Sequence, residues 1–365
     1  MKKIITSESV NCGHPDKTCD IIADSFLDEA LKYDKESQMA VECAIKDNLL
    51  MIYGEATTKA NINYKDIARN VLKDIGYKEE FEITEKISIQ SPNIANAVKK
   101  QEVCANDQGI MFGYATNEND YFMPYSIVIA HRLMKVYDEF RRQNSDDYFA
   151  DAKSQVSVEY VDNKPTRIDT VLLSVSHRKG LSHDKIVNDM QQFVINKVFG
   201  EFKNLKNNDA RLVINPSGEF YIWGSFSDSG CVGRKIVVDT YGGVGRVGGG
   251  CFSSKNSTKV DRSAAYYCRY VAKNLVAWGL CDKCEIGLSY AIGLQDPLSI
   301  EVNTFNTEKV SLEEIYKVID KNFNFRVGNM IKELNLLQPI YAKTACYGHF
   351  GRQEFPWEQL KKRVD

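Results

Sequence analysis

Segments typical of strands alternate with segments typical of helices along the chain, and this alternation constrains the fold more than any other feature. Residues 18–33 place Cys19, Ile22, Phe26 and Ala30 on one face of a helix. Three pairs of strand-like segments and a second helix follow: 39–45 with 49–53, 155–161 with 168–176, 211–215 with 219–223, and the helix 261–278. Such a pattern indicates α/β or α+β domains, in which helices cover one face of each sheet.

The apolar run 235–241 has the composition of a strand and leads into the stretch 241–250, which holds six glycines in ten residues. Gly243, Gly245 and Gly248 form a literal G-x-G-x-x-G. In a dinucleotide-binding turn these glycines open directly into a helix, with an acidic residue about 20 positions further on. Here a polar stretch follows instead. We therefore reject a nicotinamide-dependent enzyme and interpret the glycines as a turn that lets backbone approach a ligand or another chain.

Length and charge narrow the class of protein. The 365 residues correspond to about two to three domains. Lysines and arginines number 47 against 49 acidic residues, and the formal net charge of -2 gives no overall field that attracts nucleic acid or an anionic membrane. The first ten residues lack the apolar core of a signal peptide. We expect a cytoplasmic protein without a nucleic-acid or membrane partner.

The ten cysteines of such a protein are expected to be free thiols. Cys281 and Cys284 form a single C-x-x-C, but no second pair or nearby histidine completes a zinc set. His177 and His183 lie in or beside a predicted turn, and we expect both at the surface.

Residues 13–17 (GHPDK) lie directly before the helix 18–33. Proline suits a first helical turn, and the free N–H groups of a helix N-terminus bind anions. His14 and Lys17 beside these donors would complete a phosphate cradle, and Asp16 would hold a hard cation. Ordinary helix capping also accounts for the proline and the aspartate, so the residues alone leave both interpretations open.

Four cations flank the glycine stretch: Arg234, Lys235, Lys255 and Lys259. A polyphosphate needs several cations together with Mg²⁺ held by carboxylates. Asp16 and Asp261 would supply these carboxylates. A solvated charged face is the alternative. The segments 106–109 and 227–230 have the composition of tight turns and need no function.

Together these segments resemble the methionine adenosyltransferase (S-adenosylmethionine synthetase) family over essentially the whole chain. The resemblance rests on ten motifs in the family's order: TSESV, GHPDK, QSP, DQGIMFGYATNE, DAKSQV, INPSG, GRKIVVDTYGG, KVDRSAAY, SYAIG and YGHFGR. It implies synthesis of S-adenosylmethionine from ATP and L-methionine, with hydrolysis of the bound triphosphate to phosphate and diphosphate. The alternative is a non-catalytic nucleotide-binding homologue with an altered substrate site.

The resemblance also implies a role for each residue at a matching position. His14 would contact the oxygen that leaves the ribose carbon. The triphosphate would be held by Lys153, Arg234, Lys235 and Lys255, with Lys259 reaching phosphate or methionine. Two Mg²⁺ ions would be bound by Asp16 and Asp261, and an activating K⁺ by Glu42. Methionine would be positioned by Glu55, Gln90 and Asp228, with Asp107 near methionine and ribose. Adenine would lie between Phe220 and Ile292.

The family fold has three similar domains in a pseudo-threefold arrangement, each a mixed sheet with helices on one face. The resemblance implies discontinuous domains: 1–12 with 118–221 (N-terminal), 13–96 with 222–263 (central), and 97–117 with 264–365 (C-terminal). It further implies a site built between two subunits, so that a homodimer is the minimum active unit, commonly paired into a tetramer.

The chain departs from the family pattern on loops and turns near the substrates, without losing a charge assigned to triphosphate or Mg²⁺. The segment 94–105 is shorter than usual. The replaced residues are Asn93 for aspartate, Asn106 for glycine, Ser225–Phe226 for Gly-Pro, Val232 for threonine and Val247 for histidine. We expect the chemistry to survive and the turnover and methionine affinity to differ from the family's.

Overall fold

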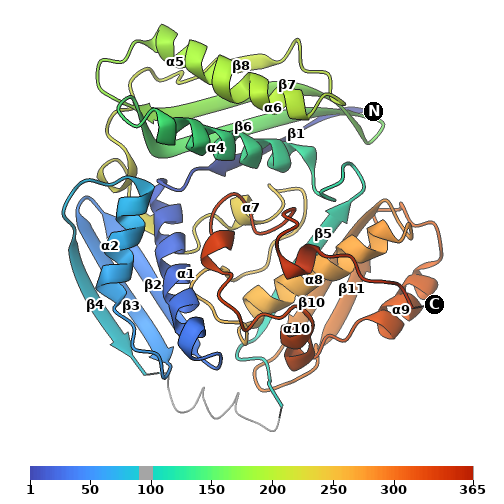
Figure 1. The fold of residues 1–365 in the computed structure, drawn as a ribbon. Coiled ribbons are helices and arrows are strands. Elements are labelled where there is room, and N and C mark those ends of the chain that lie inside the picture. The colour runs from blue at the N-terminus through green and yellow to red at the C-terminus, as the bar shows by residue number, and fades with distance from the viewer. Residues whose placement is uncertain (90–101, 365) are drawn as a thin grey trace.

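The computed structural model describes residues 1–89 and 102–364, and in that part of the chain three sheets each carry helices on one face (Figure 1). The three sheet-and-helix units surround the short helix α7 (Ile236–Asp239) and the C-terminal coil. This arrangement confirms the predicted α/β class and its three-part architecture.

The first sheet has the strand order β1-β6-β7-β8, antiparallel except for the parallel pair β7 and β8. Its strands are β1 (Lys2–Val10), β6 (Tyr148–Val161), β7 (Lys164–His177) and β8 (Arg211–Ile214). The helices on it are α4 (Tyr125–Gln143), α5 (His183–Asp189) and α6 (Asn196–Glu201), with a π-helical turn, Met190–Ile195, between the last two. Their buried side chains form a core with the inner face of the sheet.

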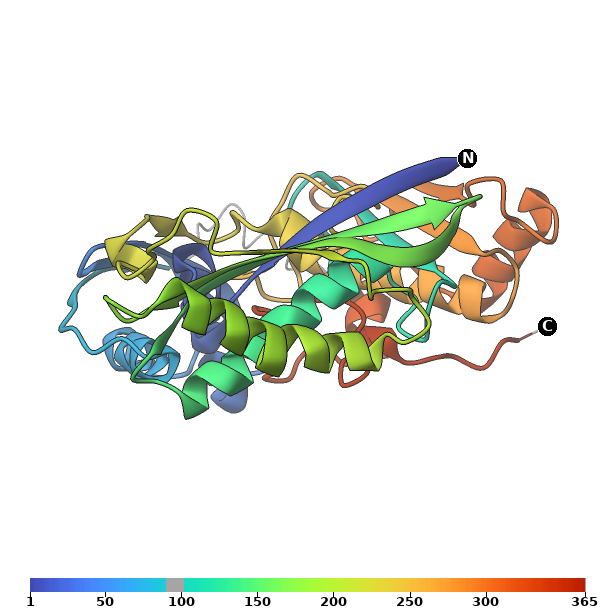
Figure 2. The ribbon, with the colours of Figure 1, turned by 90° about the horizontal axis from the view of Figure 1, so that it is seen from above.

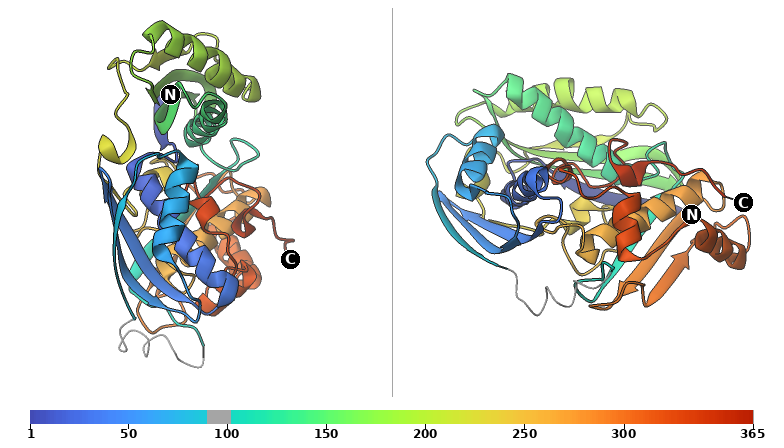
Figure 3. Two further views of the ribbon diagram at one scale, coloured as in Figure 1. Left: turned by 60° about the vertical axis from the view of Figure 1, so that its left-hand side comes forward. Right: turned by 60° about the horizontal axis from the view of Figure 1, so that its bottom comes forward.

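The second sheet, β4-β3-β2-β9, carries α1 and α2 on one face (Figure 3). Its strands are β2 (Gln38–Lys46), β3 (Leu49–Thr57), β4 (Glu82–Ser88) and β9 (Gly230–Cys231), and its helices are α1 (Pro15–Tyr33) and α2 (Tyr64–Ile75). The predicted apolar stripe of α1 is buried, and each large side chain in it contributes about 1.5–3 kcal/mol. Asp47 turns the β2–β3 hairpin in the left-handed region, with φ of 48°.

The third sheet, β11-β10-β5, is antiparallel and lies against α8. Its strands are β5 (Gly109–Thr116), β10 (Lys283–Tyr290) and β11 (Ser299–Asn303), and its helices are α8 (Val260–Ala277), α9 (Leu312–Asn322) and α10 (Val327–Glu333). The short helical turns elsewhere are Gly224–Phe226, Ala342–Thr344 and Pro356–Glu358. Gly113 lets β5 pack on α8, since a Cβ added to it would lie 2.1 Å from the backbone nitrogen of Arg269.

The domain boundaries remain a prediction. We propose the division 1–12 with 118–221, 13–96 with 222–263, and 97–117 with 264–365, because each sheet takes all its strands from one of these pairs of segments.

Two predicted strands are wrong. The run 235–241 forms the helical turn α7, because its ends bind to α1 through Lys235 and Asp239 and it pairs with no sheet in the described chain. The segment 219–223 forms no ladder either. It meets β7 only where His177 and Phe220 exchange hydrogen bonds.

The expectation for one histidine is also wrong. His177 is buried, and its ring nitrogens contact the Phe220 N–H at 3.1 Å and the Arg178 carbonyl at 3.0 Å, whereas His183 is exposed as expected. All ten cysteines are free thiols, and Cys281 and Cys284 are buried.

The helices of all three units gather on one side of the molecule and leave the other face of each sheet open (Figure 2). Each open face presents an exposed apolar side chain, namely Ile4 on β1, Met51 on β3 and Ile110 on β5. None of the helices in residues 1–89 and 102–364 is long and apolar enough to cross a membrane.

Candidate active site

The start of α1 forms the first part of the site. His14 caps the helix, and its Nδ1 accepts a hydrogen bond from the Asp16 N–H at 3.2 Å. Burial, followed by the charges of Lys235 and Lys153, lowers the pKa of His14 to about 3. The imidazole is therefore neutral at pH 7, with its proton on Nε2, and that N–H can donate to an anion.

Asp16 joins α1 to the segment that follows β9. Its carboxylate accepts hydrogen bonds from the Cys231 N–H at 3.0 Å and from Lys235 Nζ at 2.5 Å, and Arg234 Nε lies 3.5 Å away. Burial would raise the pKa of Asp16, but the hydrogen bonds from Lys235 and Cys231 outweigh it and lower the pKa. Arg234 and Lys235 therefore both lie beside the start of α1.

One interpretation of GHPDK placed Lys17 in a phosphate cradle, but its contacts contradict that placement. It is buried and donates to Asp20 Oδ2 at 2.9 Å and to Asp239. Burial opposes its charge, yet these two carboxylates outweigh burial and raise the pKa of Lys17. Asp20 also accepts the Gly233 N–H at 2.9 Å. This buried set holds the loop that carries the cation pair against α1, and spacing along the sequence gave no signal for it.

Lys153 approaches the same place from the first sheet. It lies on β6 directly opposite Val10 of β1. Its neighbour Asp151, which sequence reasoning missed, is buried and accepts the Gly224 N–H at 3.0 Å. Burial raises the pKa of Asp151 to about 6, and both Lys153 and Asp228 lie close enough to affect it. The motif DAKSQV contains Asp151 and was the available signal.

The turn before Asp228 is one of the departures from the family pattern, and the structure gives it a role. Ser225 Oγ donates to the Asp47 carbonyl at 2.6 Å, and its N–H donates to the Tyr77 hydroxyl at 3.0 Å. The Asp228 N–H then closes the turn on the Gly224 carbonyl at 3.0 Å. The unusual serine therefore anchors the turn that positions Asp228.

The start of α8 forms the second part of the site. Lys255 Nζ donates to Asp261 Oδ2 at 2.6 Å. The glycine stretch packs on this carboxylate, since a Cβ added to Gly250 would lie 2.1 Å from Asp261 Oδ2. Gly109 faces the same carboxylate. Gly250 thus allows close backbone approach to the Asp261 carboxylate, whereas approach of this stretch to a ligand or another chain stays a prediction.

Lys259 is half-buried beside this pair. Burial and then the charge of Lys255 lower the pKa of Lys259, while the nearby carboxylates of Glu55 and Asp107 oppose that shift. The Asn106 amide, oriented to satisfy its neighbours, accepts from Lys259 Nζ at 3.2 Å and donates to the Thr258 carbonyl at 3.1 Å. The asparagine that replaces a usual glycine therefore contacts Lys259, one of the cations proposed to bind substrate.

Glu42 and Glu55 lie on the open face of the second sheet, where they alternate with the buried residues of β2 and β3. Glu42 Oε2 accepts a hydrogen bond from the Tyr53 hydroxyl at 3.3 Å across the hairpin.

Cys251 links the two parts of the site. A Cβ on Gly233 would lie 2.4 Å from the Cys251 Cβ, so the loop before Arg234 packs on the glycine-rich segment. Burial raises the pKa of the Cys251 thiol, and Lys255 and Glu42 are among the charges close enough to influence it. The charged set therefore forms one surface that runs from the start of α1 to the start of α8.

The apolar residues proposed for adenine lie on two different units. Phe220 is half-buried after β8, and Ile292 is exposed after β10. Val232 and Val247 both lie in the described chain, and Val247 lines a small depression that also contains Asp261. Gln90 and Asn93 lie outside the described residues.

The donors present suit magnesium. Carboxylate oxygens are the ligands that Mg²⁺ prefers, commonly one or two per ion with the rest supplied by water and phosphate. Asp16 and Asp261 each have a carboxylate beside a lysine, and residues 1–89 and 102–364 contain no cluster of three or more ligating side chains. This arrangement fits an ion shared with a bound polyphosphate.

A capped helix start, paired lysines and two separate carboxylates are the groups that a polyphosphate-binding site requires. Comparison with known proteins gives the family. Three family models match in succession: the N-terminal (residues 2–103), central (102–220) and C-terminal (222–359) domains of S-adenosylmethionine synthetase. The chain belongs to the S-adenosylmethionine synthetase family.

Similar curated proteins cover nearly the full chain. The S-adenosylmethionine synthase of Mycoplasma mycoides is 48% identical over 99% of this chain and 96% of its own length. Those of Mesoplasma florum and Clostridium botulinum are 47% and 45% identical, each over 99% of this chain and 98% of the relative.

Proposed function

We propose that this protein synthesises S-adenosylmethionine from ATP and L-methionine and then hydrolyses the bound triphosphate to phosphate and diphosphate. The observation that carries the proposal is the joined charged surface in which His14, Asp16, Lys153 and the pair Arg234–Lys235 meet at the start of α1. Nearly full-length similarity to S-adenosylmethionine synthases supports it.

The first step is a displacement. The methionine sulfur attacks the 5′ carbon of ATP, the new S–C bond forms as the C–O bond breaks, and the electron pair leaves with the triphosphate. A thioether is uncharged and has no proton to lose, so no strong base is needed. The barrier falls through alignment of the reacting atoms and stabilisation of the charge that develops on the leaving oxygen.

The chain supplies both effects. His14 donates its Nε2–H to the leaving oxygen while remaining neutral, because its pKa lies far below 7. Lys153, Arg234, Lys235 and Lys255 hold the triphosphate, and Lys259 lies at the border with methionine. Glu55, Gln90, Asp107 and Asp228 position methionine, and Phe220 and Ile292 hold adenine. When phosphate displaces Asp16 and Asp261 from their lysines, both carboxylates become free to bind metal.

A divalent metal fits the family, and we propose Mg²⁺, with two ions held by Asp16 and Asp261. Bound there, Mg²⁺ would neutralise phosphate charge and polarise the phosphoryl oxygens.

We further propose a homodimer, itself commonly paired into a tetramer, and a cytoplasmic location. Glu42 and Glu55 lie on an open sheet face, and exposed apolar side chains occupy that face on all three units. A second copy that covers these faces would enclose the charged surface between two chains.

One assay tests the reaction. Purified protein is incubated with ATP, L-methionine, Mg²⁺ and K⁺, and the products are followed by mass spectrometry and colorimetry. We expect equal amounts of S-adenosylmethionine, phosphate and diphosphate, with ATP use strictly dependent on methionine and Mg²⁺. ATP binding without S-adenosylmethionine would instead support the non-catalytic nucleotide-binding homologue.

Potassium is expected to stimulate the reaction several-fold through Glu42. A half-buried carboxylate on an open sheet face can bind a monovalent cation, and Glu42→Gln keeps its size while removing the charge. Rates in KCl and NaCl buffers are compared for the wild type, Glu42→Gln and the exposed control Glu85→Gln on β4. Equal wild-type rates in the two salts would refute the potassium site.

A further inference from the structure

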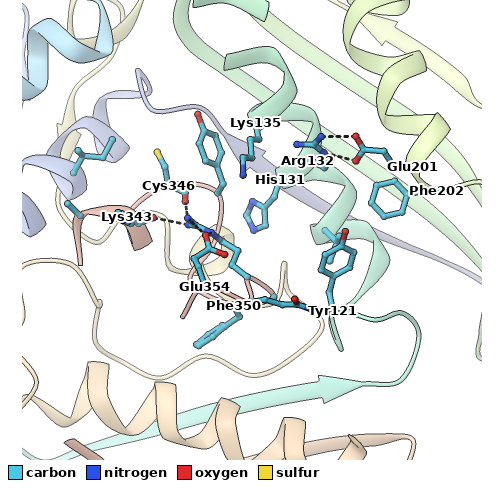
Figure 4. Close-up of a pocket in the computed structure, with 17 residues that line it drawn as sticks. Tyr121, His131, Arg132, Lys135, Glu201, Phe202, Lys343, Cys346, Phe350 and Glu354 are labelled. Carbon is cyan, nitrogen blue, oxygen red and sulfur yellow. Dashed lines mark hydrogen bonds and ion pairs between the residues drawn. The ribbon is translucent and has the colours of Figure 1, made fainter. Parts of the chain in front are cut away.

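A pocket of about 710 Å³ lies on the helix side of the molecule, between α4 and the C-terminal segment 342–354 (Figure 4). Among the residues that the structure describes, none of those lining the pocket belongs to the proposed active site. The motif YGHFGR contributes Tyr347, Phe350, Gly351 and Arg352 to one wall, and the proposed reaction gives this motif no task.

The interior of the pocket is largely apolar. Its body is formed by Ile21 of α1, Val128 of α4, Phe202 after α6, and Tyr347 and Phe350. Pockets of roughly 300–1,000 Å³ with apolar walls and a few polar groups are the usual binding sites of small molecules. The cavity is therefore large enough for a molecule with one or two rings.

The charged groups of the pocket leave an excess of positive charge. Arg132 holds Glu201 through two hydrogen bonds of 2.6 and 2.7 Å, and Arg352 Nη2 pairs with Glu354 at 2.8 Å. Each of these pairs is neutral.

Lys135 and Lys343 are exposed and add two positive charges, and Lys135 reaches from α4 toward the segment 342–354 (Figure 4). His131 adds none, because burial and then the charge of Arg352 lower its pKa to about 3. An apolar body with two positive charges matches a ligand that has an apolar body and a negative group.

We propose that this pocket binds a small amphiphilic anion, a ring system that carries a sulfonate, carboxylate or phosphate group. The rings lie on Val128 and Phe202, and the anionic group lies between Lys135 and Lys343.

Two hydrogen bonds connect the pocket wall to His14, so a ligand in the pocket affects the active site. The Tyr347 hydroxyl donates to Asn11 Oδ1 at 2.6 Å, and the Asn11 carbonyl accepts the His14 N–H at 3.0 Å. Tyr347 holds a left-handed backbone, with φ of 64°, in the turn that forms the pocket wall. A ligand that moves this turn moves His14. This effect on catalysis rests on the proposed function, whereas binding to the pocket does not.

Binding is tested with 8-anilino-1-naphthalenesulfonate, whose two rings and sulfonate match the pocket. Fluorescence titration is done with saturating non-hydrolysable ATP analogue and methionine, so that the active site is filled. The variant Lys135→Glu/Lys343→Glu reverses both charges, and Lys73→Glu/Lys321→Glu is the matched control on α2 and α9. All four lysines are exposed, so folding should be unaffected.

We expect one probe molecule per wild-type chain and an affinity at least about tenfold weaker in Lys135→Glu/Lys343→Glu, with the control unchanged. Loss of all binding when the ATP analogue is added, or equal affinity in the wild type and Lys135→Glu/Lys343→Glu, would overturn the site. This measurement needs no turnover, so it remains decisive even if the protein makes no S-adenosylmethionine.

The connection to His14 is tested by the rate of S-adenosylmethionine formation with and without the probe. We expect the probe to change the wild-type rate and to leave the rate of Tyr347→Phe at its own probe-free value, because that variant lacks the hydrogen bond to Asn11. An unchanged wild-type rate, or the same change in both proteins, would overturn the connection.

Discussion

Replacing Lys153 by methionine is expected to lower kcat for S-adenosylmethionine formation by about 10²- to 10³-fold, the range seen when one group that stabilises a developing oxyanion is removed. Lys153 lies opposite Val10 on the strand pair that leads to His14, and its charge is one of those that lower the pKa of His14. Methionine keeps the length of the side chain and removes the charge. The triphosphate would then leave with one cation fewer beside it.

Two measurements separate this role from a structural one. Lys153 is exposed, so the variant should fold and assemble like the wild type, which circular dichroism and size-exclusion chromatography check. Hydrolysis of added tripolyphosphate should fall as well, because the same lysine holds the triphosphate in the second step. Lys164→Met, an exposed lysine at the start of β7, is the control and should keep full activity. Near-normal turnover in Lys153→Met would show that the site assignment is wrong.

The elements that were predicted well have a strong period of their own. The apolar stripe of α1 and the alternating strands of the hairpins β2–β3 and β6–β7 all form as expected. Each of these segments can bury one face with neighbours close in the chain, so local pattern and tertiary structure agree.

The strand predicted for 235–241 is wrong because long-range contacts decide the structure of this segment. Its β-branched residues favour a strand, yet Lys235 binds Asp16 and Asp239 binds Lys17, partners more than 200 positions away. The same contacts explain the error at Lys17, because the GHPDK motif alone does not reveal that this lysine forms an ion pair with a distant carboxylate. Composition indicates which groups are charged, and only the fold shows how they pair.

For the candidate site, the residues alone indicated cations and carboxylates at both ends of the glycine stretch, and resemblance supplied the roles. Spacing had no means to show that Asp151 is buried beside Lys153, or that Ser225 anchors the turn before Asp228. The first depends on a contact between two units, and the second on contacts within one unit between segments far apart in sequence.

Loss of the Asp261 carboxylate is expected to lower kcat by about a hundredfold or more and to raise the Mg²⁺ concentration needed for half-maximal rate. Asp261→Ala removes the ligand, and Asp261→Asn removes only its charge. Both remove the ion pair that Lys255 Nζ forms with Asp261 Oδ2 at 2.6 Å. If Asp261 served only to hold that lysine, the rate would fall without any change in the Mg²⁺ dependence. The magnesium titration therefore separates a metal ligand from a positioning residue.

Two further variants sharpen this test. Asp282→Asn is the matched control, since Asp282 also pairs with a lysine, Lys309, at 2.7 Å but on an exposed surface, and it should leave the magnesium titration unchanged. Gly250→Ala should imitate the loss of Asp261, because the added Cβ would lie 2.1 Å from Oδ2 and must displace the carboxylate. If Gly250→Ala and Asp261→Asn both kept the wild-type magnesium titration, the ion would have to be held elsewhere, and Asp16 would be the remaining carboxylate assigned to it.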